Sequence, residues 1–477
     1  MKPLRSDIGS SATATRCSCT DLARILLGVT RLRAQCSGQR VRAVIMKYRS
    51  NRRQFLHRVG FTLGSAFHLG WRTRPNSGHT RSANDRISLG VVGVGEHGSE
   101  LLRSCTEEQV TALCDVDRRA LDAVRSAYPH ASLYQEFRQM FDREKLDAVV
   151  VATADHTHAV ICAAALQSGY HVYCASPLTR TISEARRLSE LAARTRCATQ
   201  VGEPFTSLEV EVRLQQLLQN KTVGSISEVR AWSRRSHGEL ILGSEASALP
   251  ATLDFDLWLG PTLPRPYRNS FTPGKWRHWW DFGSGTLADS GAAQFDLIHR
   301  ALNLTAPLSV EAEGPALHLD FTPAWLSVRW LFARSDGPAP LIVRWHHGVS
   351  PIVSEQIQSP LDAIEGIQFL GDHGQLLVTA NDLLVKLHGE AAHRPAELSD
   401  VRKHSNPLVE WRKACRGEKR WDRRFETAAS FTESLLLGNV AFRTDRKLLW
   451  DPHKLVAINL PDADEYILHR YAPGWEI

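Results

Sequence analysis

Residues 86–115 read RISLGVVGVGEHGSELLRSCTEEQVTALCD, and this stretch decides the fold of the body that follows it. It opens with a short apolar run from Ile87 to Val92, which is typical of a parallel strand that is buried on both faces. A complete G-x-G-x-x-G pattern follows at once and leads into a helical stretch through Leu101 and Leu102. The six residues of the pattern are Gly93, Val94, Gly95, Glu96, His97 and Gly98.

Each glycine of this pattern has a physical task. The first permits the tight turn, the second lets a pyrophosphate approach the backbone, and the third allows close packing of helix on strand. A second apolar run, Val110 to Cys114, ends at Asp115, which follows Gly93 by 22 residues. That spacing matches the acid that binds the ribose of a dinucleotide. The order of strand, turn, helix, strand and acid predicts dinucleotide binding, with a purely structural glycine turn as the alternative.

Asp115 also bears on which dinucleotide fits. A carboxylate can accept a hydrogen bond from the 2′-hydroxyl of NAD, whereas it would repel the 2′-phosphate of NADP. Arg118 and Arg119 lie close in sequence and would soften that repulsion. The sequence therefore favours NAD and leaves NADP open.

Strands and helices continue to alternate after Asp115. Predicted strands at 147–153, 171–174 and 198–201 are separated by helices that begin at Asp155 and Ile182. This alternation predicts a doubly wound parallel sheet. His156 and His158 lie two apart, on different faces of the predicted helix, so we expect no metal ion there and assign this helix start to the dinucleotide crevice.

The pattern changes near residue 205. Strand-like runs at 226–232, 308–313, 325–332, 341–346, 366–370 and 375–378 are joined by irregular Pro/Gly/Trp-rich connections, and helices are predicted at 407–415 and 425–444. The fold class expected is α/β, a Rossmann domain followed by an α+β domain with a large, mostly antiparallel open sheet. We divide the chain into an N-terminal extension (1–83), the Rossmann domain (84–205) and the second domain (206–477).

Composition excludes several classes of protein. Residues 1–86 hold 17 Lys and Arg against three Asp, a net charge of +14, so the rest of the chain carries −7 of the overall +7. A body without clustered positive charge is a poor nucleic-acid binder. The nine cysteines form no C-x-x-C pair, which argues against a structural metal or a disulfide framework. No apolar run reaches the length of a membrane-spanning helix.

The N-terminal extension resembles a targeting segment. Residues 50–58 read SNRRQFLHR and match the core of the twin-arginine export signal at Arg52, Arg53, Phe55 and Leu56, with a weakly apolar run from Val59 to Gly70 behind them. We therefore expect export to the periplasm of a protein that is already folded. A start at Met46 would make residues 1–45 an upstream extension. An ordinary basic arm on a cytoplasmic protein is the alternative.

From about Asn84 onward, the chain resembles the Gfo/Idh/MocA family of glucose–fructose oxidoreductases and inositol dehydrogenases, in particular its exported bacterial branch. The resemblance rests on ALCDVD (112–117), ATADHTHA (152–159), HVYC (171–174) with Pro177-Leu-Thr, DFDLWLGP (254–261), WWDFG (279–283), LLGNVA (436–441) and YAPGW (471–475). It implies NAD(P)-dependent redox chemistry on sugars or related polyols, cofactor contacts at Thr153, His158 and Pro177, and a homo-oligomer.

The resemblance also shows what has changed. Family members take the hydroxyl proton with a lysine from a Glu-Lys-Pro motif, aided by an aspartate and a histidine four residues apart. Here the lysine position is Ser176, after Ala175, and the second pair is Asp289 and Ala293. Only Asp289 remains of the three expected catalytic groups, and His156 or His278 is an alternative proton carrier.

Three hypotheses follow. The protein is a sugar oxidoreductase with a modified proton relay, a catalytically inactive dinucleotide- or sugar-binding protein (a pseudoenzyme), or an NAD-assisted glycosidase. The aromatic run Trp276 to Asp281 fits either a sugar-stacking surface or an ordinary core. The paired His346 and His347 are interpreted as structural.

Overall fold

The computed structural model describes residues 86–105, 107–202, 204–235, 248–271, 275–334, 337–348, 363–395, 407–418 and 423–477. The twin-arginine segment and the Met46 start lie outside these residues and stay predictions. Everything below concerns one unit of the chain, Arg72 to Ile477. None of the helices among the described residues is long and apolar enough to cross a bilayer.

The first half of this unit is built on a six-stranded sheet in which every pairing is parallel. Its strands are β1 (Ser88–Val92), β2 (Gln109–Cys114), β3 (Ser132–Tyr134), β4 (Ala148–Val151), β5 (His171–Cys174) and β6 (Thr199–Val201). Their order, β3-β2-β1-β4-β5-β6, reverses between β1 and β4. This parallel order is that of a doubly wound sheet, so the predicted Rossmann fold is confirmed. Ligands of such folds bind at the carboxyl ends of the strands, where the order reverses.

Helices cover both faces of this sheet because its strands are apolar on both sides. The connecting helices are α2 (Glu96–Ser104), α3 (Arg118–Arg125), α4 (Phe137–Arg143), α5 (Asp155–Gln167) and α6 (Ile182–Arg194). Leu89 and Val91 pack with α2 and α3, whereas Val149 and Val151 pack with α4, α5 and α6. The start of α6 is fixed by a capping box in which Thr181 and Glu184 satisfy each other's polar groups.

The second half is built on a nine-stranded sheet. Its strands are β7 (Ile226–Ser233), β8 (Pro307–Glu313), β9 (Leu326–Phe332), β10 (Leu341–His347), β11 (Glu365–Gly371), β12 (Gly374–Val378), β13 (Leu383–Leu387), β14 (Leu448–Asp451) and β15 (Val456–Ala457). The order is β13-β12-β11-β7-β10-β9-β8-β14-β15, and only the pairing of β7 with β10 is parallel. The prediction of a mostly antiparallel second sheet is therefore confirmed.

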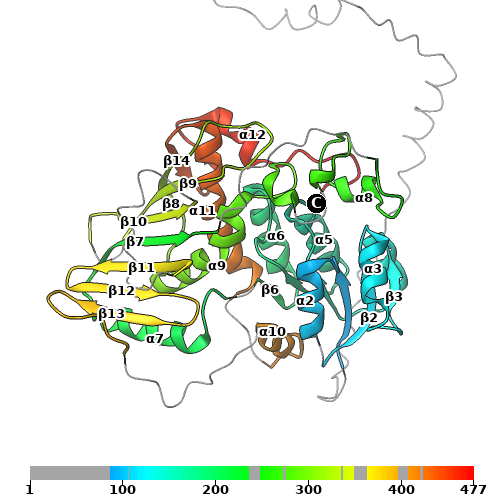
Figure 1. The fold of residues 1–477 in the computed structure, drawn as a ribbon, viewed down its shortest axis with the longest axis horizontal. Helices are drawn as coiled ribbons and strands as arrows, with labels where there is room; N and C mark the ends of the chain where they lie inside the picture. Colours follow the sequence, from blue (N-terminus) through cyan, green and yellow to red (C-terminus); the bar gives the residue numbers. More distant parts are fainter. Residues whose placement is uncertain are drawn as a thin grey trace, which may run out of the picture. The chain divides into compact units, whose positions relative to one another are not determined.

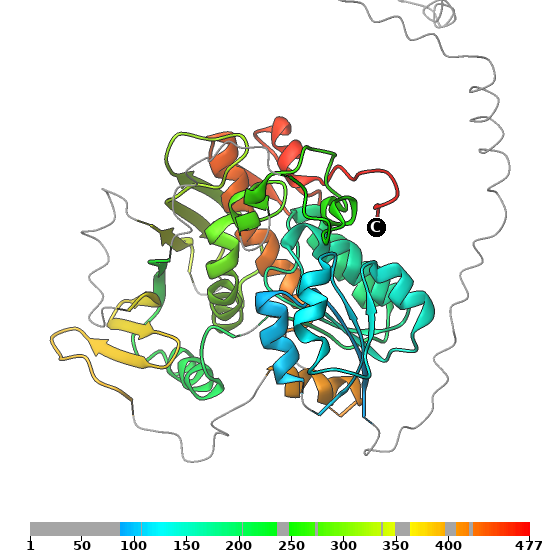
Figure 2. The ribbon, with the colours of Figure 1, turned by 45° about the vertical axis from the view of Figure 1, so that its right-hand side comes forward.

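Helices of the second half join this sheet to the first domain. They are α7 (Leu208–Gln219), α8 (Phe255–Leu259), α9 (Gly285–Leu302), α10 (Pro407–Cys415), α11 (Phe425–Thr444) and α12 (Asp464–Ile467). Helix α9 contacts β7 and β10, and α11 lies between β8 and the Rossmann helix α6 (Figures 1 and 2). The two sheets therefore share one continuous core.

One helix of the predicted second domain packs on the first sheet instead. The indole of Trp411 in α10 is fully buried and donates a hydrogen bond to the carbonyl oxygen of Ala198. The neighbouring Arg412 is buried too, and it pairs with Glu108 at 2.8 Å. A single boundary near residue 205 therefore does not describe where α10 packs.

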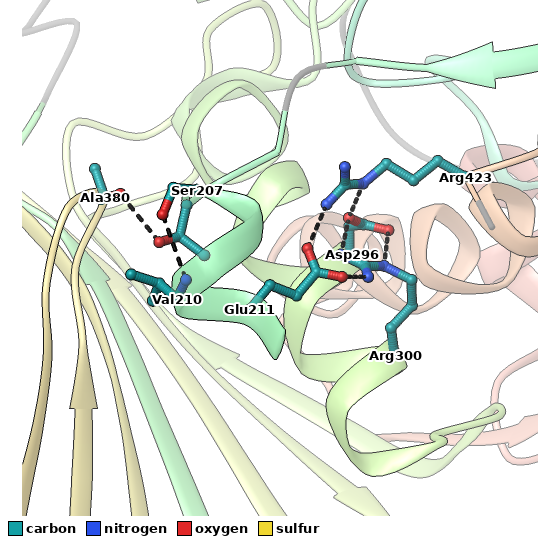
Figure 3. Close-up of polar contacts among 8 residues, drawn as sticks. Ser207, Val210, Glu211, Asp296, Arg300, Ala380 and Arg423 are labelled. Carbon is teal, nitrogen blue, oxygen red and sulfur yellow. Dashed lines mark hydrogen bonds and ion pairs between the residues drawn. The ribbon is translucent and has the colours of Figure 1, made fainter. Parts of the chain in front are cut away.

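A buried ion-pair network ties the elements around the edge strand β6 together (Figure 3). Arg423 donates to Asp296 at 2.7 Å and to Glu211 at 3.0 Å, and Arg300 pairs with the same two carboxylates. The four side chains come from α7, α9 and the segment before α11. Since the backbone of Arg423 also accepts from the amide of Val201, this network fixes α9 and α11 against the Rossmann sheet.

Candidate functional site

A cavity lies along the carboxyl ends of β1, β4 and β5, where the strand order reverses. Its empty volume is about 1370 Å³, a figure that includes open solvent at its mouth. Its wall runs from the loop of Gly93 to Gly98, past Asp115, to Thr153 and Ser176. One cavity therefore joins the predicted dinucleotide residues to the position of the missing lysine.

The glycines of the loop do what the sequence predicts. Gly93 has a φ of +85°, and a Cβ there would lie 2.5 Å from the carbonyl oxygen of Ala152. A Cβ on Gly98 would lie 2.0 Å from the carbonyl oxygen of Gly93, so only glycine lets α2 start this close to the turn. At Gly95 nothing lies within 4 Å of an added Cβ. The second glycine therefore leaves an open approach to the backbone at the N-terminus of α2, where phosphates bind favourably.

Asp115 stands beyond this loop and is held by backbone amides. Its carboxylate accepts hydrogen bonds from the amide of Val94 at 2.9 Å and from the amide of Asp117 at 3.0 Å. Burial raises the pKa of Asp115, an effect that these hydrogen bonds oppose. With two oxygens, the carboxylate keeps acceptor capacity for a ribose hydroxyl.

The charges around Asp115 favour an unphosphorylated ribose. Asp117 also lines the cavity, and it forms an ion pair with Arg119 at 2.7 Å. Arg118 donates to Gln135 at 2.6 Å. Both arginines are therefore engaged by neighbouring side chains, and a 2′-phosphate would meet two carboxylates.

Three of the predicted cofactor residues lie behind the cavity wall. Val94 is buried, and its amide is used by Asp115. His158 is 1% exposed, and its ring nitrogens lie 2.8 Å from the carbonyl oxygen of Pro177 and 3.0 Å from that of Thr153. Contact of Val94, His158 and Pro177 with a cofactor therefore stays a prediction, and what the structure gives for His158 is a link between the loops that follow β4 and β5. Gly93, Gly95, Glu96, His97, Gly98, Asp115 and Thr153 do line the cavity.

Of the three positions of the family's catalytic groups, Ser176 belongs to the described wall of the cavity, with its hydroxyl beneath Gly202, where an added Cβ would lie 1.9 Å from the oxygen. Asp289 and Ala293 do not belong to that wall. Asp289 is exposed on α9 and accepts a hydrogen bond at 3.0 Å from Nε of Arg277, which does line the cavity. A catalytic role for Asp289 therefore stays a prediction.

Asp155 belongs to the wall of the same cavity as Ser176. Asp155 is 5% exposed and accepts a hydrogen bond from the amide of Ser284, the first residue before α9, at 3.0 Å. Burial raises the pKa of Asp155 to about 7, against the opposing effect of Arg277. The sequence assigned this helix start to the dinucleotide crevice but gave no signal that Asp155 in particular is a site residue, because its burial depends on residues far away in the chain. Among the described residues, no group of His, Cys, Asp and Glu could hold a metal ion.

His156 is fixed in an uncharged state. Its Nε2 lies 2.8 Å from the carbonyl oxygen of Trp258, and its ring stands edge-on to Trp258 and Phe282. Burial lowers the pKa of His156 to about 3. The imidazole therefore stays neutral and cannot exchange a proton with a substrate near neutral pH.

The aromatic run from Trp276 to Asp281 was expected to form either a sugar-stacking surface or an ordinary core. Trp279 and Trp280 are buried, Trp279 in a core cluster with Phe271 and Phe282. Trp276 lies in the cavity wall, with the guanidinium of Arg277 4.3 Å from its ring centre. The run thus supplies core side chains, one of which, Trp276, also lines the cavity. His278 is not part of the described wall.

Comparisons with known proteins agree with this geometry. The family description "Oxidoreductase family, NAD-binding Rossmann fold" matches residues 87–203, and "Oxidoreductase family, C-terminal alpha/beta domain" matches residues 222–343. The chain is 29% identical over 160 residues to inositol 2-dehydrogenase of Klebsiella pneumoniae, which covers 32% of this chain and 48% of that protein. It is 29% identical over 121 residues to alpha-N-acetylgalactosaminidase of Shewanella oneidensis, covering 23% of this chain and 26% of that one. The chain thus matches less than half the length of these relatives.

Solved structures share the fold. The WlbA dehydrogenase of Bordetella pertussis, solved with NADH and UDP-GlcNAcA, has a TM-score of 0.54 at 14% identity and covers 77% of this chain and 99% of its own. GenD2 from gentamicin A biosynthesis, solved with NAD, has a TM-score of 0.52 at 17% identity, covering 78% and 98%. The two matched domains, the glycine loop and the NAD-binding Rossmann fold show that this chain belongs to the Gfo/Idh/MocA oxidoreductase family.

Proposed function

We propose that this protein transfers a hydride between a hydroxyl-bearing carbon of a sugar or sugar derivative and NAD. One observation carries the proposal: a single cavity joins the glycine loop and Asp115 to a pocket walled by Ser176, Asp155 and Arg277. The wall mixes apolar surface with a few polar groups, as binding sites for small polar molecules do. The inositol and sugar dehydrogenases among the similar proteins point to the same class of substrate.

Each part of the cavity has a task in this proposal. Bound NAD would supply the acceptor for the hydride at its nicotinamide ring. The amides at the start of α2 would hold the pyrophosphate, and Asp115 would accept from the ribose. At the end of the cavity away from Asp115, the small side chain of Ser176 would leave room for a sugar ring, and Trp276 would face that ring. Arg277 would donate hydrogen bonds to substrate hydroxyl groups while Asp289 holds its Nε.

A second candidate is a protein that binds NAD and a sugar but catalyses nothing. The replacement of two expected catalytic groups by Ser176 and Ala293 favours it. General acid–base assistance is worth about 10²–10⁴-fold, so its loss could leave only slow turnover. An NAD-assisted glycosidase, the third hypothesis, needs the same proton-handling groups, and the glycosidase relatives match only about a quarter of this chain.

Reduction of NAD⁺ by a panel of sugars, polyols and sugar acids tests the proposal. Purified protein and the double variant Ser176→Lys with Ala293→His are followed by NADH absorbance. Turnover by the unchanged protein supports the oxidoreductase. If only the double variant turns over, the protein is a binding protein on a dehydrogenase scaffold. If neither protein binds NAD, the proposal fails altogether.

A further inference from the structure

The reacting end of the cavity lacks the family's lysine, yet oxidation of an alcohol releases a proton that some group must accept. Ser176 stands at the lysine position, and among the described wall residues that follow β4 and β5 the titratable acids and bases are His156 and Asp155. An unassisted hydroxyl does not titrate near neutral pH. His156 is held uncharged by burial and by the carbonyl oxygen of Trp258. This leaves Asp155.

Strand register places Asp155 and the position of the lost lysine at the same edge of the sheet. Strands β4 and β5 are parallel neighbours, and Val151 pairs with Cys174 at their carboxyl ends. Asp155 follows four residues after Val151, and Ser176 follows two residues after Cys174. Both side chains therefore lie at the same edge of the sheet, where both line the cavity.

The surroundings of Asp155 are suited to proton exchange. Burial favours the neutral carboxylic acid, whereas the cation of Arg277 and the amide of Ser284 favour the carboxylate. The carboxylate of Asp289 on α9 opposes ionisation. The other titratable neighbours are the uncharged His156 and the thiol of Cys174, whose pKa burial raises well above its usual value. These opposing influences hold the pKa of Asp155 at about 7, close to the value at which a general base works best at neutral pH.

We propose that Asp155 is the base of this site and takes the place of the family's lysine, an inference that rests on the proposed function. In the step, the O–H bond of the substrate carbinol breaks and its proton goes to a carboxylate oxygen of Asp155. The C–H bond breaks at the same centre, its electron pair leaves as hydride to NAD⁺, and a carbonyl forms. Asp155 then returns its proton to water, and NADH carries the two electrons away.

The alternative is that Asp155 has a purely structural role, because its Oδ2 accepts a hydrogen bond from the amide of Ser284 and so anchors the start of α9. The variant Asp155→Asn separates the two readings. Its amide oxygen can still accept from Ser284, but the group can no longer exchange a proton. Asp142→Asn makes the same chemical change at an exposed position on α4 and serves as the matched control.

The test is calorimetric titration of nucleotide-free protein with NAD⁺ and with NADH at pH 6.5, in buffers of different ionisation enthalpy, which gives the number of protons released on binding. The ring of NAD⁺ is cationic and that of NADH is neutral. A cation beside a carboxylate lowers its pKa by about 1–3. Binding of NAD⁺ is therefore expected to release at least about 0.5 proton more per protein than binding of NADH releases. Asp155→Asn is expected to abolish this difference and Asp142→Asn to keep it. With a substrate from the panel, Asp155→Asn is expected to lower kcat by about 10²–10⁴-fold.

Each result decides between the readings. If NAD⁺ and NADH release the same number of protons from the unchanged protein, Asp155 is not the base. The same conclusion follows if Asp155→Asn keeps the difference while both nucleotides still bind. In either case the proposed dehydrogenase function survives. Absence of binding by either nucleotide overturns both the base and the function.

Discussion

The unusual environment of Asp155 predicts a pH dependence of stability that needs neither cofactor nor substrate. Its pKa is about 7 in the folded protein and near 3.8 in an unfolded chain. Because the folded state holds the proton more tightly, this group contributes stability that is fully present below about pH 4 and is lost as the pH rises through 7. At about 1.4 kcal/mol for each pH unit, the total loss is about 4 kcal/mol.

The variant Asp155→Asn replaces the titratable carboxyl group by an amide that does not titrate, and it keeps an oxygen that can accept from the amide of Ser284. About 3 kcal/mol of the loss falls between pH 5 and pH 8. With about 2.1 cal/mol/K of unfolding entropy per residue over the roughly 340 residues that the structure describes, this corresponds to about 4 °C. The melting temperature of Asp155→Asn minus that of the unchanged protein is therefore expected to rise by about 4 °C across this range.

Differential scanning calorimetry of nucleotide-free protein at half-unit pH steps measures this difference. Asp142→Asn, with its exposed carboxylate, is expected to give a flat difference. A difference between Asp155→Asn and the unchanged protein that does not vary with pH would refute the reasoning, because the carboxyl group would then titrate alike in the folded and unfolded states.

Three further predictions concern the cofactor loop and the buried network. Gly98→Ala places a Cβ 2.0 Å from the carbonyl oxygen of Gly93 and is expected to abolish NAD⁺ binding, measured by quenching of tryptophan fluorescence. Asp115→Asn removes the charge that repels a 2′-phosphate and is expected to improve the ratio of NADP⁺ to NAD⁺ affinity about tenfold; an unchanged ratio in calorimetric titrations would contradict this. Arg423→Met leaves Asp296 and Glu211 with one cation instead of two and is expected to cost about 3–5 kcal/mol of stability, seen as a lower urea midpoint.

The Rossmann half was predictable because its signals are local. The turn at Gly93, the steric need for Gly98 and the acid that ends β2 all lie within a few residues of the elements they organise. The helix bounds 182–194, 407–415 and 425–444 agree with the structure for the same reason, since apolar spacing and capping act within one helix. The strand-like runs after residue 205, joined by irregular connections, likewise predicted the second, mostly antiparallel sheet.

What the sequence could not show depends on residues far apart in the chain. The parallel pairing of β7 with β10 joins segments more than 100 residues apart. The return of α10 to the first sheet has no local signal, because the burial of Trp411 depends on a partner 213 residues away. Asp155 is the clearest case, since burial raises its pKa while Arg277 and Ser284, from the second half of the chain, oppose that rise.

The most direct test of this account is a crystal structure of the protein with NAD⁺ bound. We expect the pyrophosphate on the amides at Gly95 to Gly98, the adenosine ribose against Asp115, and the nicotinamide ring between Ser176 and Asp155. A nicotinamide ring bound away from Ser176 and Asp155, or a cavity that stays empty at saturating NAD⁺, would contradict the account.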